Sequence, residues 1–120
     1  MKDFRTLKVW EKSHQLSLEV YKITAGFPKH EMFSLTSQMR RAAISVPSNI
    51  AEGCCRSSDA ELARFLYISV GSVSELEYQT ILARDLKYIS NEAYESINTK
   101  INHVKSMLIA FIQKLQKLKA

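Results

Sequence analysis

Five polar residues recur at steps of three and four, the spacing that places side chains on one face of a helix. They are Gln38, Arg41, Ser45, Asn49 and Glu52. Such groups bind phosphate or another ligand, form hydrogen bonds that fix helix register, or simply face water. We favour the structural network, because small alanines flank this stripe and it contains no lysine.

Glu75 is the acid that fits this network best, since it stands beside the small residue Ser72 in a later helical stretch. Its carboxylate could pair with Arg40 or Arg41. Removing one partner of a buried ion pair leaves an uncompensated charge. We therefore place Arg40, Arg41 and Glu75 in the structural network and expect Glu75→Ala to disrupt folding or assembly.

Lysines dominate the last part of the chain, where no acid follows Glu95. They form either a phosphate-binding surface or a solvated helix face near a C-terminus, where cations are favoured. The net charge of +5 and the pI of about 9.3 favour a polyanionic partner. Without interleaved aromatic residues, contacts to the backbone are favoured over base reading. The candidate nucleic-acid-binding residues are Lys100, Lys105, Lys114 and Lys117.

The residues that could catalyse a reaction or bind a metal are dispersed. His14, His30 and His103 fall on three different segments without partners at metal-ligand spacing. Cys54 and Cys55 are adjacent, so neither a disulfide framework nor a zinc site is predicted. We expect no enzymatic activity, catalytic residue, metal or cofactor.

The elements that must position these residues are four helices in one domain, 1–120. Few glycines and prolines interrupt the apolar spacing, Ser58 begins a capping box, and Pro47 is expected to kink its helix without ending it. The fold class is all-α, an antiparallel up-down-up-down four-helix bundle with extra apolar stripes that favour self-association. The helices are expected at about 7–25, 33–55, 59–88 and 91–118.

The location is expected to be cytoplasmic, with no membrane partner. The sequence has no apolar run of 18 residues, and its first ten residues do not resemble a signal peptide.

Several motifs resemble the four-helix bundle proteins encoded in intervening sequences of bacterial 23S ribosomal-RNA genes. The most specific is the SQMRRAA block followed by NIAEG and, at the right spacing, GSVSE. One departure is Phe33-Ser34-Leu35, where the family pattern is Phe-Gly-Leu, which affects only a local turn. The segments that carry the resemblance are Phe4–Trp10, Tyr21–Thr24, Phe27-Pro28, Ser37–Ala43, Asn49–Gly53 and Gly71–Glu77.

The resemblance implies a four-helix bundle that assembles as a ring-shaped homopentamer and has no established enzymatic activity. It also implies kinship with the accessory protein of diversity-generating retroelements, a basic pentamer that binds a reverse transcriptase and nucleic acid. The family pattern therefore implies structural roles for Gln38, Arg41, Asn49, Glu52 and Glu75.

Two functions remain open at this point. The first is an oligomeric module that binds RNA or DNA through backbone contacts. The second is a protein-interaction scaffold whose basic face meets an acidic protein partner. From the resemblance, a reverse transcriptase is a candidate protein partner.

Overall fold

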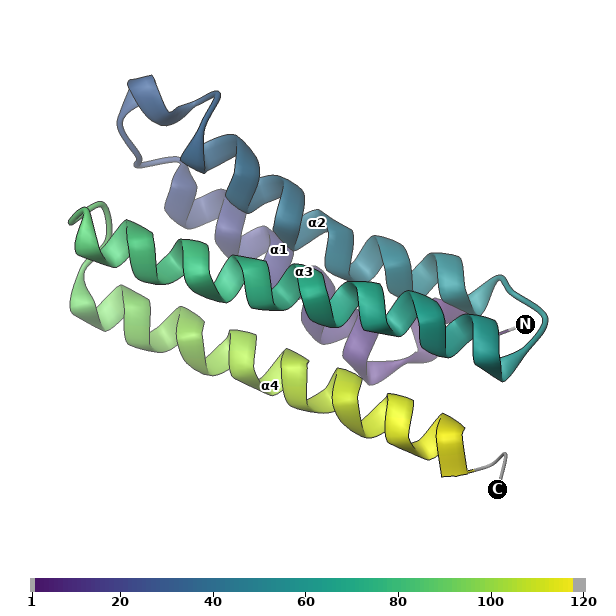
Figure 1. Cartoon of the computed structure of the whole chain (residues 1–120). Coiled ribbons are helices and arrows are strands. Elements are labelled where there is room, and N and C mark those ends of the chain that lie inside the picture. Colours follow the sequence, from purple (N-terminus) through teal and green to yellow (C-terminus); the bar gives the residue numbers. More distant parts are fainter. Residues whose placement is uncertain (1, 118–120) are drawn as a thin grey trace.

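Four long helices follow one another in the computed structural model, which describes residues 2–117 (Figure 1). Two short 3₁₀ helices, η1 and η2, precede α1 and α2, and no strand occurs among the described residues. The predicted all-α class with four helices is therefore confirmed. The bounds are Phe4–Thr6 (η1), Lys8–Thr24 (α1), Lys29–Glu31 (η2), Leu35–Cys54 (α2), Asp59–Asp85 (α3) and Asn91–Lys117 (α4).

The helix bounds differ from the expected ranges by at most three residues. The second helix begins at Leu35 rather than 33, because residues 32–34 form a turn in which Ser34 has a non-helical φ of −129°. The third ends at Asp85 rather than 88, because Lys87 adopts a φ of 66°, the left-handed conformation that stops helices. The fourth was expected to reach position 118, which lies outside the described residues.

Serine side chains begin two of the helices. The Ser58 hydroxyl accepts a hydrogen bond from the Glu61 N–H at 3.2 Å, which confirms the predicted start of α3. The Ser90 hydroxyl accepts one from the Ala93 N–H at 3.1 Å, ahead of α4. Each bond satisfies a backbone donor that has no partner within its own helix.

The core lies where the apolar stripes of the four helices meet. Complete burial of a large aliphatic side chain contributes roughly 1.5–3 kcal/mol, so this layer supplies most of the driving force for folding. The largest fully buried apolar side chains are Leu16, Val20, Met39, Val46, Ile50, Leu66, Val73, Leu76, Ile101, Val104 and Leu108.

The α2–α3 pair is the most closely packed. A Cβ atom built on Gly53 would lie 2.9 Å from both Leu62 Cδ1 and Phe65 Cβ, so only glycine fits there without movement. The Ser69 hydroxyl donates to the Val46 carbonyl at 2.8 Å. The Gly53 contact lies where α2 ends and α3 begins, and the hydrogen bond between Ser69 and Val46 joins the two helices nearer their middle.

The α1–α4 pair is the least closely packed of the neighbouring helix pairs. Helix α1 has 17 residues, whereas α3 and α4 have 27 each, so α1 covers only part of their length (Figure 1). The bundle is elongated, with extents of 48 × 23 × 20 Å. Among residues 2–117, no helix has the combination of length and apolarity needed to cross a membrane.

Candidate nucleic-acid interface

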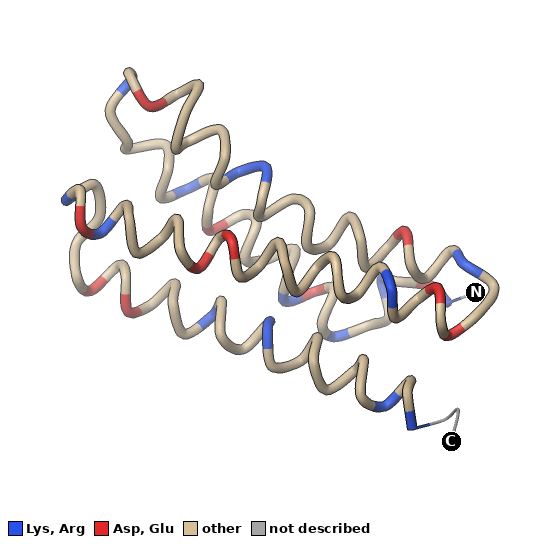
Figure 2. The backbone as a smooth tube through the Cα atoms, in the orientation of Figure 1, with Lys and Arg blue, Asp and Glu red and all other residues tan. Residues whose placement is uncertain are grey.

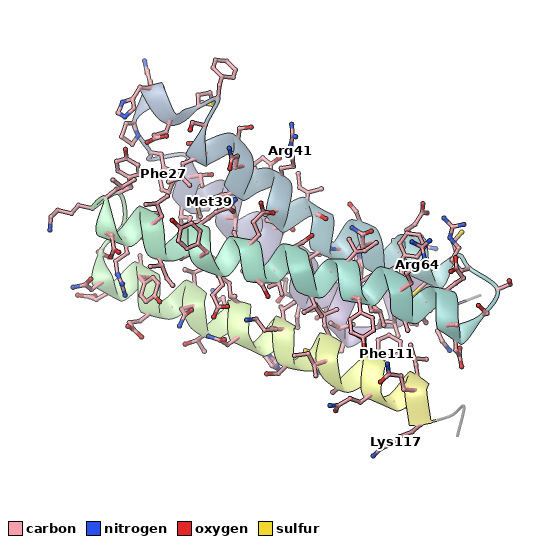
Figure 3. All side chains as sticks on the ribbon, viewed as in Figure 1. Phe27, Met39, Arg41, Arg64, Phe111 and Lys117 are labelled. Atoms are coloured by element: carbon pink, nitrogen blue, oxygen red, sulfur yellow. The ribbon has the colours of Figure 1, made fainter. Side chains whose placement is uncertain are left out.

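Lys114 and Lys117 lie in the last turns of α4. Both side chains are exposed, and neither forms an ion pair with a described residue. Figure 2 shows that the acids of α4 lie near its start, whereas its lysines lie from the middle of the helix to its end, and Figure 3 shows Lys117 pointing away from the bundle. Among the described residues, therefore, no acid neutralises either of these two lysines.

Lys100 and Lys105 are already engaged. The Lys100 ammonium donates to Glu19 Oε1 on α1 at 2.8 Å, and the hydrogen bond lowers the pKa of Glu19. Lys105 pairs with Glu77 on α3. Because these two lysines face different helices, the four candidates of α4 do not form one surface.

Helix α1 contributes a lysine that the sequence reasoning missed. Lys8 and Lys114 line one shallow groove of about 300 Å³, whose other walls include Leu7, Met107 and Phe111. Lys8 is exposed and makes no ion pair with a described residue. We name Lys8, Lys114 and Lys117 the terminal lysine surface.

Part of the predicted polar network does tie α2 to α3. The hydroxyl groups of Ser45 and Ser72 lie 2.7 Å apart, one on each helix. The Asn49 amide donates to the Ser45 carbonyl at 2.8 Å and lies 3.0 Å from the Ser45 hydroxyl. All three side chains are half-buried, which is consistent with a structural role.

Arg40 does not pair with Glu75. Its guanidinium donates to the Thr24 hydroxyl at 2.9 Å and lies over the Tyr21 ring, 4.6 Å from the centroid. The predicted pairing failed because Arg40 faces α1, whereas Glu75 lies on α3. Arg40 therefore links α1 to α2.

The other members of the predicted network are exposed or only partly buried. Gln38, Arg41 and Glu75 make no side-chain hydrogen bond or ion pair within residues 2–117, and Figure 3 shows Arg41 pointing outward. Glu52 pairs only with Arg56, two residues beyond the end of α2, at 3.4 Å. The expectation of a buried Arg–Glu pair is thus incorrect for the single chain.

The three histidines lie on separate elements. His14 stacks on Trp10 with ring centroids 5.2 Å apart, and His30 lies 3.9 Å from Glu31 Oε2. His103 lines the groove between α1 and α4. Within the described part of the chain, no group of three or more His, Cys, Asp or Glu side chains could hold a metal ion.

Cys54 is buried and its pKa is raised by that burial, so its thiol is less readily ionised than an ordinary one. Cys55 is exposed, and both cysteines are free.

Comparison with known proteins shows which family this chain belongs to. A crystal structure at 1.70 Å of a protein with unknown function from the S23 ribosomal protein family of Bacteroides thetaiotaomicron has a TM-score of 0.81 and 27% identity to this chain. The alignment covers 88% of this chain and 95% of that one. No curated protein matches. The family model described as 23S rRNA-intervening sequence protein matches residues 5–110, and the chain therefore belongs to that family.

Proposed function

We propose that this chain is a non-catalytic helical-bundle protein that binds RNA or another nucleic acid through backbone phosphates. The observation that carries the proposal is the terminal lysine surface. Lys8, Lys114 and Lys117 are exposed, make no ion pair with described acids, and come from the first turn of α1 and the last turns of α4. A cytoplasmic location, where RNA is available, accords with this function.

Lysine ammonium groups suit phosphate binding that is independent of base sequence. Each is a compact charge on a flexible stem and releases bound counterions from nucleic acid when it contacts a phosphate. The net charge of +5 adds long-range attraction for a polyanion. Lys100 and Lys105 contribute less in this proposal, because Glu19 and Glu77 already neutralise them.

We further propose an antiparallel up-down-up-down bundle that assembles into a ring-shaped homopentamer. Unpaired polar side chains on α2 and α3, among them Arg41 and Glu75, support assembly, because such groups can pair across an interface. Apolar side chains of α1, α2 and the segment between them support it as well. Those with the largest exposure there are Leu18, Tyr21, Met32, Phe33 and Ile44.

Assembly would strengthen binding without new kinds of contact. Five copies of the terminal lysine surface in one ring would engage a long polyanion at several points, and linked weak contacts raise the overall affinity. An acidic protein partner is the second candidate function, favoured by the lysine-rimmed groove between α1 and α4.

The test is a titration of labelled structured RNA and single-stranded DNA with nuclease-treated protein of known oligomer size, at several salt concentrations. The decisive variant is the double charge reversal Lys114→Glu with Lys117→Glu. Its control is Lys29→Glu with Lys87→Glu, which has the same net charge but alters exposed lysines of η2 and the α3–α4 connection.

We expect the wild type and the control to bind, with affinity that falls as salt rises. The decisive variant should bind about tenfold or more weakly, with a salt slope smaller by about one unit for each phosphate that it no longer neutralises. Equal reductions of affinity in both double variants would reject the terminal lysine surface. Absence of binding by the wild type at low salt would reject nucleic acid as the partner.

A further inference from the structure

Four exposed positions lie on one face of α3, and we name them the α3 ridge. They follow one another at steps of three, four and three residues, and they are Ile68, Gly71, Glu75 and Tyr78. Tyr78 is 62% exposed and Ile68 is 42% exposed. Glu75 makes no ion pair with a described residue. Large apolar side chains gathered on one exposed face are typical of a contact surface.

Gly71 is the residue of the α3 ridge that packing within the chain does not explain. It lies in the middle of a 27-residue helix, where glycine is less favourable than alanine. No described atom of another element lies within 4 Å of the position that a Cβ would take. The missing side chain leaves a notch between Ile68 and Glu75, and a large side chain of another molecule fits such a notch.

A groove with an apolar lining opens between the end of α1 and the start of α2, and we name it the α1–α2 groove. Its volume is about 380 Å³. Phe33 is 95% exposed, so almost its whole ring faces water in the single chain. A partner that covered this lining would remove apolar surface from water. The exposed large apolar side chains that line the groove are Tyr21, Met32, Phe33 and Ile44.

Arg41 gives the α1–α2 groove a positive edge. Its side chain makes no hydrogen bond or ion pair within residues 2–117, and Figure 3 shows it pointing outward. The neighbouring Arg40 is already engaged by Thr24 and the Tyr21 ring. No described residue that lines the groove is an acid. The groove therefore matches, in charge and polarity, a helix that presents a carboxylate beside an apolar ring.

We infer that the α3 ridge of one copy of this chain docks into the α1–α2 groove of a second copy. Glu75 of the first copy meets Arg41 of the second, and a planar guanidinium can bind a carboxylate through two parallel hydrogen bonds. This inference rests on the proposed self-assembly and names the two surfaces that carry it. Because the two surfaces differ, each copy offers its ridge to one neighbour and its groove to another, and such contacts can close into a ring.

The spacing of the flanking residues agrees with this docking. On α3, Gly71 and Tyr78 lie four and three residues from Glu75, which is about one helical turn to either side. The groove repeats this spacing on α2, where Arg41 stands four residues after Ser37 and three before Ile44. Faces with matching spacing can lie along one another, with the side chains of one between those of the other.

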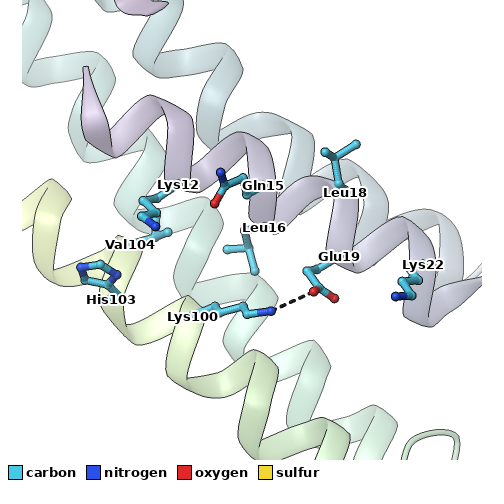
Figure 4. A pocket seen from close by; sticks show the side chains of 9 residues that line it. All are labelled: Lys12, Gln15, Leu16, Leu18, Glu19, Lys22, Lys100, His103 and Val104. Carbon is cyan, nitrogen blue, oxygen red and sulfur yellow. Dashed lines mark hydrogen bonds and ion pairs between the residues drawn. The ribbon is translucent and has the colours of Figure 1, made fainter. Parts of the chain in front are cut away.

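The groove between α1 and α4 suits the α3 ridge less well (Figure 4). Its volume is about 420 Å³, and Lys12 and Lys22 of α1 line it. However, its apolar floor at Leu16 and Val104 is already buried by the chain itself. Among the described residues that line it, Leu18 is the one exposed apolar side chain. The ridge would therefore cover less apolar surface there than in the α1–α2 groove.

The test is light scattering after size-exclusion chromatography, over a range of protein concentrations. Nuclease-treated full chain is used, so that no nucleic acid contributes to the assembly. Arg41→Glu and Glu75→Arg each place like charges opposite one another, and the double variant restores opposite charges. The controls Lys87→Glu and Glu95→Arg change the net charge by the same amounts at exposed residues outside both surfaces.

Two further variants test the apolar part of the contact. Phe33→Ser removes the most exposed ring of the groove, and its control Ile109→Ser removes an exposed apolar side chain of α4. Gly71→Leu fills the notch of the ridge, and its control Ser106→Leu places a leucine at an exposed small residue of α4. Circular dichroism and thermal unfolding verify that each variant is folded.

We expect each single charge reversal to weaken self-association about tenfold or more, and the double variant to recover most of the loss. Phe33→Ser and Gly71→Leu should weaken it severalfold or more, while all controls assemble as the wild type does. If the wild type assembles and the single reversals assemble equally well, the inference is overturned and the proposed self-assembly stands. A wild type that stays monomeric at every concentration would reject both and leave the two surfaces to a different protein.

Discussion

The Ser17 hydroxyl on α1 donates a hydrogen bond to the Ala43 carbonyl on α2 at 3.0 Å, and both residues are buried. Ala43 lies four residues before Pro47, which has no N–H to donate. The carbonyl that the proline leaves without its usual helical donor thus receives one from the neighbouring helix. The same hydroxyl lies 3.1 Å from the Ser13 carbonyl of its own helix. This arrangement accounts for the unbroken course of α2 through Pro47.

Ser17→Ala is therefore expected to destabilise the protein by about 1–3 kcal/mol, the usual effect of leaving a buried carbonyl without a partner. In a Pro47→Ala background the loss of stability should be smaller, because the substituted alanine has an N–H for the Ala43 carbonyl. Urea unfolding of the two single variants and the double variant measures this coupling. Strictly additive effects would contradict the assignment of Ser17 as the replacement donor.

Gly53 and Gly71 should respond in opposite directions to alanine. At Gly53 the new methyl group would meet Leu62 and Phe65 at 2.9 Å, so Gly53→Ala should cost about 1–3 kcal/mol through overpacking between α2 and α3. Gly71 is exposed, with no described atom of another element within 4 Å of the position of a new Cβ. Gly71→Ala should stabilise by up to about 1 kcal/mol through helix propensity. Thermal and urea unfolding of both variants tests this difference in sign.

Glu75→Ala should leave the fold of the single chain intact and weaken assembly. Glu75 is exposed and makes no ion pair with a described residue, so its removal leaves no buried charge. Its proposed role lies between copies of the chain, where it could meet Arg41. Light scattering after size-exclusion chromatography reports the assembly, and circular dichroism reports the fold. Glu95→Ala, at an exposed acid of α4, is the control; wild-type assembly of Glu75→Ala would exclude Glu75 from the interface.

Glu31 should give the protein a specific sensitivity to acid. Its carboxylate accepts a hydrogen bond from the Tyr88 hydroxyl at 2.7 Å and another from the Leu35 N–H, and these bonds hold its pKa below the ordinary value of 4.5. A lowered carboxyl pKa stabilises the fold above the ordinary value, and the stabilisation disappears as the pH falls through the lowered one.

Tyr88→Phe should remove part of that dependence. The substitution keeps an aromatic ring beside Phe27 but deletes the hydroxyl that stabilises the Glu31 carboxylate. Between about pH 5 and pH 3 the midpoint of thermal unfolding should therefore fall less in Tyr88→Phe than in the wild type. A parallel decline in the two proteins would show that this hydrogen bond does not contribute to acid sensitivity.

Helix positions could be predicted from local patterns because capping and apolar periodicity act over a few residues. The sequence predicts a helix start at Ser58, and its hydroxyl does cap α3. Contacts between helices were harder to predict. Arg40 and Arg41 are adjacent, yet one lies over Tyr21 of α1 and the other points to solvent, since successive helix positions differ by about 100°.

The candidate site, too, could be predicted only in part, because its residues come from helices that are distant in the sequence. The excess of lysines in the last helix was sufficient to predict Lys114 and Lys117 as candidate binding residues. Lys8, Lys12 and Lys22 were not predicted. The regular spacing of Lys8, Lys12, Gln15, Glu19 and Lys22, at steps of four and three, was the available signal. Only the packing of α1 against α4 places these residues beside the lysines of the last helix.

By itself, the sequence determined the number of helices, their approximate limits and the family, because these follow from local spacing and from motifs. The tertiary structure decided which charges remain free. Lys100 and Lys105 appear equivalent to Lys114 and Lys117 in the sequence, yet Glu19 and Glu77 neutralise the first two. Ion pairs join residues that are distant in the chain, so they depend on the relative placement of whole helices, which is settled only when the core packs.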